Sequence, residues 1–293
     1  MRTGFTLPQF GPSAAASPDG VARFAREAEA LGAASLWAAD RLLVPTRPTV
    51  GYGGTTTIPE RFRSALDPFL VLTTAAAVTT RPLLGFSVLN APFYSPALLA
   101  RQLTTLDVLS GGRVIPGFGV GWSPEEYGAL NVSMSERGAR LEETLDILDA
   151  LWTANPVSHQ GAFWEIPEIH ADLKPVQRPA PPVYLGGTSP AALSRVARRA
   201  AGWLPSTIAD GHFDAAGIAG SLERIRAEAA TLGRPAPGAI LLVSTLPTTT
   251  VADIRAVLTA AEEVIGIDHA LVGLMTAAAD VDEALSLAAR LLA

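Results

Sequence analysis

Residues 182–200 read PVYLGGTSPAALSRVARRA, and this stretch holds one complete copy of the pattern that decides the fold. A short apolar run leads into Gly186-Gly187, and an amphipathic segment begins at Pro190. Ser189 can cap a helix, and Pro190 suits the first helical turn because the N–H that it lacks would have no partner there. The stretch therefore predicts a strand, a tight turn and a helix in succession.

Seven further pairs of this kind, each an apolar run followed by a segment with helical periodicity, bring the total to eight. The apolar runs lie near 3–7, 34–39, 83–89, 113–120, 182–186, 202–205, 239–246 and 269–274. The helical segments lie near 18–31, 65–79, 96–109, 137–153, 190–200, 213–232, 251–265 and 280–292. Eight strand–helix pairs are the number of a closed (β/α)8 barrel, so we expect one α/β domain, a TIM barrel, over residues 1–293.

Two stretches rich in proline and glycine interrupt the alternation. Residues 41–64, after the second predicted strand, are expected to form a long insertion at the face where barrels carry their active sites. Residues 155–181, after the fourth predicted helix, are expected to hold a small hairpin that turns at Gln160-Gly161. Pro116 falls inside the fourth apolar run, and because proline removes a ladder bond, that strand should end or bulge there.

Five predicted helix starts carry serine or aspartate followed by proline, which suits the N-cap and the first helical position. These pairs are Ser17-Pro18, Asp67-Pro68, Ser95-Pro96, Ser123-Pro124 and Ser189-Pro190. Ser123 with Glu126 also fits a capping box. The acidic residues within 136–143 are expected on a solvated helix face with local ion pairs.

Composition argues against several classes of function. With 48% hydrophobic residues the chain can bury a large core, and no apolar run reaches the roughly 20 residues of a membrane helix. The net charge of −6 and the lack of a basic patch argue against a nucleic-acid partner. The absence of cysteine excludes thiol nucleophiles and disulfides. Met1–Pro8 is too short and polar for a signal peptide, so we expect a cytoplasmic protein.

Polar and glycine-rich residues at the ends of predicted strands are the first candidates for a site. Residues 186–189 could place backbone N–H groups and a helix N-terminus around a phosphate, or they form an ordinary tight turn. Asp40-Arg41 lies at the end of the second predicted strand and could be part of a site or form a surface ion pair. Ser87 and Asn90 lie at the end of the third and could contact a ligand or simply terminate the strand. The glycines of 117–122 let backbone pass along a flat ligand, or they relieve crowding at the rim.

The sequence shows no catalytic nucleophile, acid–base dyad or metal site of its own. The histidines lie far apart without metal-ligand spacing, and there is no G-x-S-x-G motif. We expect no metal ion, and an enzyme with this sequence would leave the difficult chemistry to a bound cofactor.

Taken in order, these segments resemble the bacterial luciferase-like monooxygenase superfamily, most closely its coenzyme F420-dependent oxidoreductase branch. The resemblance rests on LWAAD at 36–40, LDVLSGGR at 106–113, GFGVGW at 117–122, ERGAR at 136–140, and GGTSP at 186–190 with WLP at 203–205. It implies a (β/α)8 barrel with a deazaflavin or flavin lying across the C-terminal ends of the strands. It also implies a cis peptide bond between Ser87 and Val88 behind the ring.

The resemblance further implies a set of site residues, of which 186–189 would hold the cofactor phosphate. The cofactor-binding candidates are Asp40, Ser87, Val88, Asn90, Gly119, Gly121, Gly186, Gly187, Thr188 and Ser189. The substrate-pocket candidates are Gln9, Tyr52, Trp122 and Trp203. Arg41 is the candidate catalytic residue, as a stabiliser of developing negative charge. The better-known F420 dehydrogenases carry histidine at the position of Arg41, and some carry glutamate at that of Trp122, so sugar-phosphate or secondary-alcohol oxidation is not expected.

Three functions remain open at this point. The first is an F420-dependent oxidoreductase that moves a hydride between C5 of the deazaflavin and a small organic substrate, with 41–64 as a lid. The second is an FMN-dependent monooxygenase that uses reduced flavin and oxygen. The third is a non-catalytic barrel that only binds a ligand. In each case we expect a small-molecule partner, neither nucleic acid nor membrane, and a homodimer.

Overall fold

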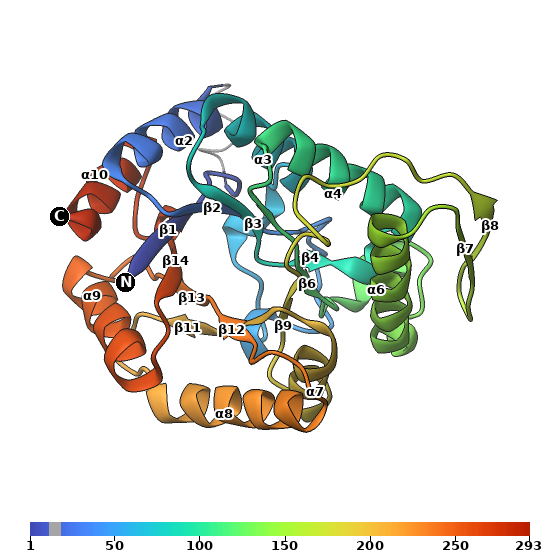
Figure 1. Cartoon of the computed structure of the whole chain (residues 1–293). Coiled ribbons are helices and arrows are strands. Elements are labelled where there is room, and N and C mark those ends of the chain that lie inside the picture. Colours follow the sequence, from blue (N-terminus) through green and yellow to red (C-terminus); the bar gives the residue numbers. More distant parts are fainter. Residues whose placement is uncertain (12–18) are drawn as a thin grey trace.

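The computed structural model describes residues 1–11 and 19–293, in which strands form the centre and helices an outer ring (Figure 1). The barrel strands are β1 (Arg2–Thr6), β2 (Ser35–Ala38), β3 (Leu83–Phe86), β4 (Leu89–Asn90), β5 (Val114–Ile115), β6 (Gly117–Gly119), β9 (Tyr184–Gly186), β10 (Gly202–Leu204), β11 (Ser206–Ile208), β12 (Gly238–Ala239), β13 (Leu241–Ser244) and β14 (His269–Gly273). The helices are α2 (Gly20–Leu31), α3 (Pro68–Val78), α4 (Pro96–Ser110), α5 (Pro124–Ala129), α6 (Arg137–Thr153), α7 (Pro190–Arg199), α8 (Ala215–Thr231), α9 (Val251–Ala260) and α10 (Val281–Leu292). Single helical turns are η1 (Tyr52–Gly54), η2 (Glu60–Arg63), η3 (Ala91–Phe93), η4 (Met134–Glu136), η5 (Ala261–Ile265) and η6 (Leu274–Thr276).

Three of the eight predicted strands are each split into two short pieces, β3 and β4, β5 and β6, and β12 and β13, and the strand predicted over 202–205 is β10, which continues after Pro205 as β11. The barrel strands form two hydrogen-bonded sheets of seven and five strands. With the two pieces of each strand counted together, the pairings follow a closed cycle and all of them are parallel. The pairs run β1–β2, β2–β3, β3–β5 with β4–β6, β6–β9, β9–β10, β10–β12 with β11–β13, β13–β14 and β14–β1. Pro116 separates β5 from β6, as its place in the apolar run predicts. The predicted (β/α)8 fold is confirmed.

The core fills the layer between the strands and the surrounding helices. On α2 the buried residues Val21, Phe24, Ala25 and Ala28 recur every three or four positions, which places them on one helical face. A smaller cluster around Trp37 packs apart from the main core. Because parallel barrel strands are covered on both sides, they are continuous apolar runs rather than alternating ones.

The insertion after α6 is an antiparallel hairpin, β7 (Val157–Gln160) and β8 (Glu165–Ile169), which projects from the ring of helices (Figure 1). Its turn follows Gln160, as predicted. The carboxylate of Glu143 accepts the backbone N–H groups of Ala162, Phe163 and Trp164. The expectation that Glu143 lies on a solvated face is wrong, because this turn covers it.

The predicted helix caps are borne out in part. Asp67 accepts the N–H of Leu70, and Ser189 accepts the N–H of Ala192. Ser95 stands at the N-cap of α4, but its side chain makes no capping bond. Ser17-Pro18 lies outside the described residues.

The capping box predicted for α5 is wrong. The hydroxyl of Ser123 donates to Glu125 rather than capping the helix, and Glu126 turns away toward the loop that begins at Arg41. Both glutamates contact a distant part of the chain in place of the local hydrogen bonds of a capping box.

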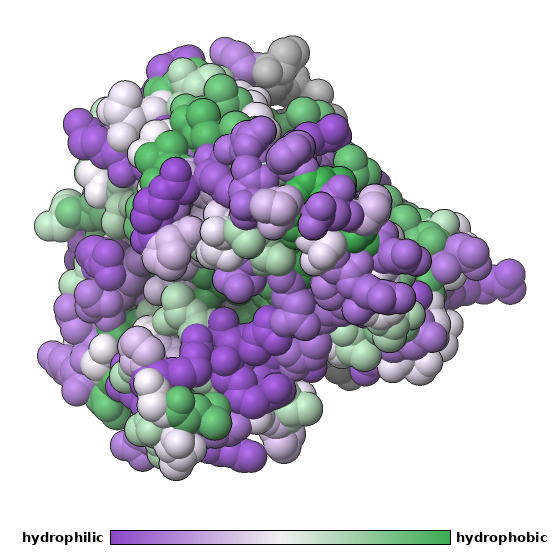
Figure 2. All heavy atoms as spheres, turned by 45° about the vertical axis from the view of Figure 1, so that its right-hand side comes forward, coloured by the Kyte–Doolittle hydropathy of each residue, from purple (hydrophilic) through white to green (hydrophobic). Residues whose placement is uncertain are grey.

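Hydrophilic residues cover most of the face drawn in Figure 2, with hydrophobic residues in smaller groups between them. Within residues 1–11 and 19–293, every helix is too short or too polar to cross a membrane.

Candidate active site

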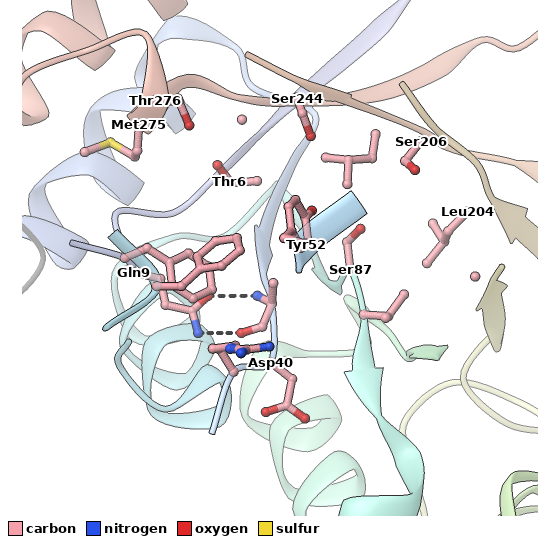
Figure 3. A pocket seen from close by; sticks show the side chains of 18 of the residues that line it. Thr6, Gln9, Asp40, Tyr52, Ser87, Leu204, Ser206, Ser244, Met275 and Thr276 are labelled. Carbon is pink, nitrogen blue, oxygen red and sulfur yellow. Dashed lines mark hydrogen bonds between the residues drawn. The ribbon is translucent and has the colours of Figure 1, made fainter. Parts of the chain in front are cut away.

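A cavity of about 320 Å³ lies at the C-terminal ends of the barrel strands. Figure 3 shows how separate strands contribute to its wall, with Thr6 at the end of β1, Ser87 after β3, Ser206 in β11 and Ser244 at the end of β13. The carboxyl ends of barrel strands are where active sites form in this architecture, because loops from every strand converge there.

Most of the predicted site residues meet at this cavity, although they come from distant parts of the chain. Those that line it are Gln9, Asp40, Arg41, Tyr52, Ser87, Val88, Asn90, Trp122, Gly186 and Gly187. Those that do not line it are Gly119, Gly121, Thr188, Ser189 and Trp203. Gln9 lines the wall with its polar atoms already engaged, since its amide bonds both the N–H and the carbonyl of Ala39 (Figure 3).

Asp40 is a partly buried carboxyl group just after the end of β2. Its Oδ2 accepts the N–H of Asn90 at 3.0 Å, and the hydroxyl of Tyr94 also hydrogen-bonds to it. Burial raises the pKa of Asp40 to about 6, although these hydrogen bonds act in the opposite direction. Near neutral pH the group is therefore able to hold or release a proton.

The peptide bond between Ser87 and Val88 is cis, as the family resemblance implies. The N–H of Ser87 donates to the carbonyl of Ala38 at 2.8 Å. A Cβ atom on Gly119 would lie 2.6 Å from Cγ2 of Val88, so the glycine makes room for this side chain. Gly119 thus supports the cavity floor from behind instead of lining the cavity.

The turn between β9 and α7 forms an exposed rim of the cavity. Gly187 has a φ of +103°, and a Cβ there would lie 2.9 Å from the Cβ of Ala192, so the turn requires glycine. The indole Nε1 of Trp203 donates to the carbonyl of Gly187 at 2.9 Å. Trp203 is 1% exposed and fixes the turn from behind, which corrects its prediction as a pocket wall.

Arg41 is a buried cation beside an acidic partner and an indole ring. Its Nη1 donates to Oε2 of Glu126 at 3.2 Å, and its Cζ lies 4.5 Å from the ring centroid of Trp122. Burial lowers the pKa of Arg41 from its ordinary value, while Glu126 opposes that shift. Arginine is effectively always protonated in proteins, so the site holds a permanent positive charge.

The loop after β2 is tied to the first turn of α5. Oε1 of Glu126 accepts the N–H of Leu42 at 2.8 Å, and Oε1 of Glu125 accepts the N–H of Thr49 at 2.7 Å. The bond from Thr49 is the largest cause that lowers the pKa of Glu125 to about 2. The loop therefore sits across the cavity on two charge-assisted anchors.

Several wall residues lack any strong local signal in the sequence. Phe10, Arg61 and Phe62 line the cavity, and Glu126 supports Arg41 behind it. Ser206 and Ser244 could have been found, because they follow or end apolar runs in the same way as Asp40.

Comparison with known proteins places this geometry in a family. The sequence model of the luciferase-like monooxygenase family matches residues 1–291. An uncharacterised protein of Mycobacterium tuberculosis is 36% identical over 228 residues, which cover 75% of each chain. The FMNH2-dependent dimethylsulfone monooxygenase of Pseudomonas putida is 34% identical over 154 residues, covering 50% of this chain and 40% of that enzyme.

Two solved structures share the fold over nearly the whole length of the chain. Monooxygenase RslO1 from Streptomyces bottropensis superposes with a TM-score of 0.81 at 20% identity, covering 99% of this chain and 97% of that chain. An F420-dependent secondary alcohol dehydrogenase, solved with an F420–acetone adduct, gives a TM-score of 0.76 at 15% identity, with the same two coverages of 99% and 97%. The fold thus occurs in a monooxygenase and in an F420-dependent dehydrogenase.

Proposed function

Since the chain belongs to the luciferase-like monooxygenase family, we propose that it is an oxidoreductase that works with coenzyme F420. The observation that carries this proposal is the continuity of the cavity. One wall runs from Asp40 at the end of β2, past the Ser87–Val88 peptide, to Gly186-Gly187 at the start of α7. A flat ring with a phosphate tail is a ligand that needs all three parts at once.

The residues present fit such a coenzyme. The first N–H groups of α7 have no partner inside the helix, so they favour an anion at the Gly187 turn. The hydroxyl oxygen of Ser189 accepts the N–H of Ala192, which leaves its O–H available, with the backbone and Thr188, to donate to a phosphate. Val88 and Asn90 face the cavity where the ring would rest.

When bound, the deazaflavin supplies the hydride chemistry, and the chain supplies position, charge and exclusion of water. The carboxyl group of Asp40, whose pKa burial raises to about 6, can take up or release a proton in the wall of the cavity. Arg41 presents positive charge toward a substrate oxygen on which negative charge develops. Tyr52 and Trp122, 5.7 Å apart between ring centroids, cover the cavity from the loop side and keep water out.

FMN is the second candidate, in a monooxygenase that uses reduced flavin and oxygen. The 34% identity to an FMNH2-dependent enzyme favours it. The phosphate turn suits both coenzymes, because each carries a phosphate group.

Separate titrations with F420 and with FMN, followed by coenzyme fluorescence and thermal unfolding, test the proposal. We expect F420 to bind and to stabilise the fold by about 2.7 kcal/mol at a hundredfold excess over Kd. Binding of FMN alone would select the monooxygenase, and binding of neither would overturn the proposal. Turnover of reduced F420 with an electron acceptor separates an enzyme from a barrel that only binds.

Gly187→Ala is the informative variant, with Gly32→Ala as its matched control. Both glycines have a positive φ, +103° and +98°, but Gly32 caps α2 away from the cavity. We expect both variants to lose stability and only Gly187→Ala to bind coenzyme at least tenfold more weakly, since a tenfold loss is about 1.4 kcal/mol. Equal affinity in the two variants would contradict the phosphate assignment.

A further inference from the structure

Arg41, which lines the cavity, leaves one edge of its guanidinium group unpaired. Its side chain is 4% exposed, and Nη1 donates to an acidic partner, Glu126. Nε and Nη2 are buried and have no hydrogen-bond partner within residues 1–11 and 19–293. A buried donor left unpaired is costly because it has given up its bond to water, so this edge indicates an acceptor that a bound molecule brings.

The unpaired atoms define the shape of that acceptor. Nε–H and one Nη2–H of arginine point the same way in the plane of the group, as a fork of two parallel donors. Such a fork matches the two oxygens of a carboxylate, whereas a single carbonyl oxygen leaves one donor without a good partner. Glu126 cannot turn to fill this edge without losing the N–H groups of Leu42 and Leu43.

Arg61 is a second cation in the wall of the cavity, and its guanidinium lies 5.0 Å from the ring centroid of Phe62. The guanidinium of Arg41 lies 6.0 Å from the centroid of the same ring. Asp40 also lines the cavity, and because burial raises its pKa to about 6, a fraction of it is uncharged near neutrality. The two guanidinium groups favour an anionic ligand, against the opposing charges of Glu126 and of ionised Asp40.

The rest of the wall at this end is aromatic. The ring of Tyr52 lies 5.0 Å from that of Phe62 and 5.7 Å from that of Trp122, and Phe10 lies 5.2 Å from Phe62. Flat apolar groups pack well against such rings. The wall thus suits a ligand whose body is planar and unsaturated.

We infer that the substrate is a small aromatic or planar unsaturated carboxylic acid whose carboxylate binds the Nε–Nη2 edge of Arg41. This inference names the substrate class of the proposed redox reaction and so rests on the proposed function. Arg61 adds long-range attraction, and the rings of Tyr52, Phe62 and Trp122 hold the body of the acid.

Paired ligands test the inference on the unmodified protein. Benzoate and 2-naphthoate are compared with benzamide and 2-naphthamide by calorimetric titration, with and without F420. Because a charge-assisted hydrogen bond contributes about 1.5–3 kcal/mol, we expect an acid to bind about 10- to 100-fold more tightly than its amide. Equal affinity of acid and amide in both pairs would overturn the inference, and this comparison needs no variant.

Arg41→Lys keeps the charge and removes the fork, so we expect it to lose most of the preference for the acid. Arg101→Lys, on the exposed side of α4, is the matched control and should keep that preference. An Arg41→Lys protein that is folded by circular dichroism and retains the full preference would also overturn the inference.

Coenzyme titrations of the same proteins separate this inference from the proposed function. Coenzyme binding without preference for the acid would overturn the inference and leave the proposed function standing. Preference for the acid without binding of F420 or FMN would overturn the proposed function and leave the inference standing. If Arg41→Lys weakens coenzyme binding as much as acid binding, the edge serves the coenzyme and the inference is wrong.

Discussion

At Asp40, burial and hydrogen bonding act on one carboxyl group in opposite directions. Burial raises its pKa to about 6, against the lowering effect of the N–H of Asn90. The folded state therefore binds this proton more tightly than the unfolded chain between the ordinary value of 3.8 and about 6. Across that pH window the contribution of Asp40 to the free energy of unfolding falls as the pH rises. Above the window Asp40 is ionised, and the folded state bears the full cost of burying its charge.

Asp40→Asn removes this charge and keeps an oxygen that can accept the N–H of Asn90. Relative to the wild type, we expect the variant to gain about 1–3 kcal/mol of stability near pH 8 and nothing near pH 4. Urea unfolding at both pH values measures the difference. His269, whose pKa burial lowers to about 4, titrates in the same window in both proteins and so cancels. A difference that does not change with pH would contradict the prediction.

The sequence predicted the position of a site residue where that position depends only on the end of one strand. Asp40 and Asn90 follow apolar runs, and both reach the cavity. Trp203 was misplaced because side chains alternate along a strand, and its neighbour Leu204 is the one that faces the cavity. Glu126 was missed as the partner of Arg41, since a contact between a loop and a distant helix leaves no local pattern.

At the scale of elements, the turn between β9 and α7 depends on an indole from the next strand. Trp203→Phe removes the bond from Nε1 to the carbonyl of Gly187 and leaves most of the packing. We expect a loss of about 0.5–1.5 kcal/mol in unfolding free energy, together with weaker coenzyme binding. Chemical unfolding and coenzyme titration measure the two effects.

Trp152→Phe is the control for this prediction. Trp152 is equally buried, and its Nε1 donates to the hydroxyl of Thr104 at 3.1 Å, in the contact between α6 and α4. It should lose similar stability and bind coenzyme normally. A matching loss of coenzyme affinity in both variants would mean that Trp203 acts only through general stability.

The order of the elements was readable because apolar runs and helical periodicity alternate so regularly. The break at Pro116 was also readable, and the same rule applied to Pro205 would have predicted the break between β10 and β11. The break around residues 87–88 has no proline and was indicated by the family resemblance alone, through the cis peptide bond expected there. The break at Ile240 has no local signal in the sequence.

For the whole molecule, large apolar side chains are exposed on two neighbouring helices. Leu70 on α3 is 69% exposed, and Leu98 and Leu109 on α4 are 50% and 62% exposed. The two helices pack against each other, so these leucines belong to one side of the barrel. Large apolar side chains exposed on one side of a protein are typical of interaction sites, and we propose that this side forms a homodimer.

Light scattering after size exclusion should give twice the mass of the 30.5 kDa chain. Introducing Leu70→Glu together with Leu98→Glu should give the mass of one chain without changing coenzyme affinity, because neither leucine lines the cavity. A wild-type protein that remains at the mass of one chain at high concentration would contradict the dimer.

The central claim is that the barrel holds a flat redox coenzyme with its phosphate on the turn before α7. A crystal structure of the protein grown with F420, or with FMN if that coenzyme binds instead, tests it most directly. We predict electron density for the phosphate at the amides of residues 187–189 and for the ring against Val88, within reach of Asp40. Density for the coenzyme elsewhere on the molecule, with this cavity empty, would contradict the claim.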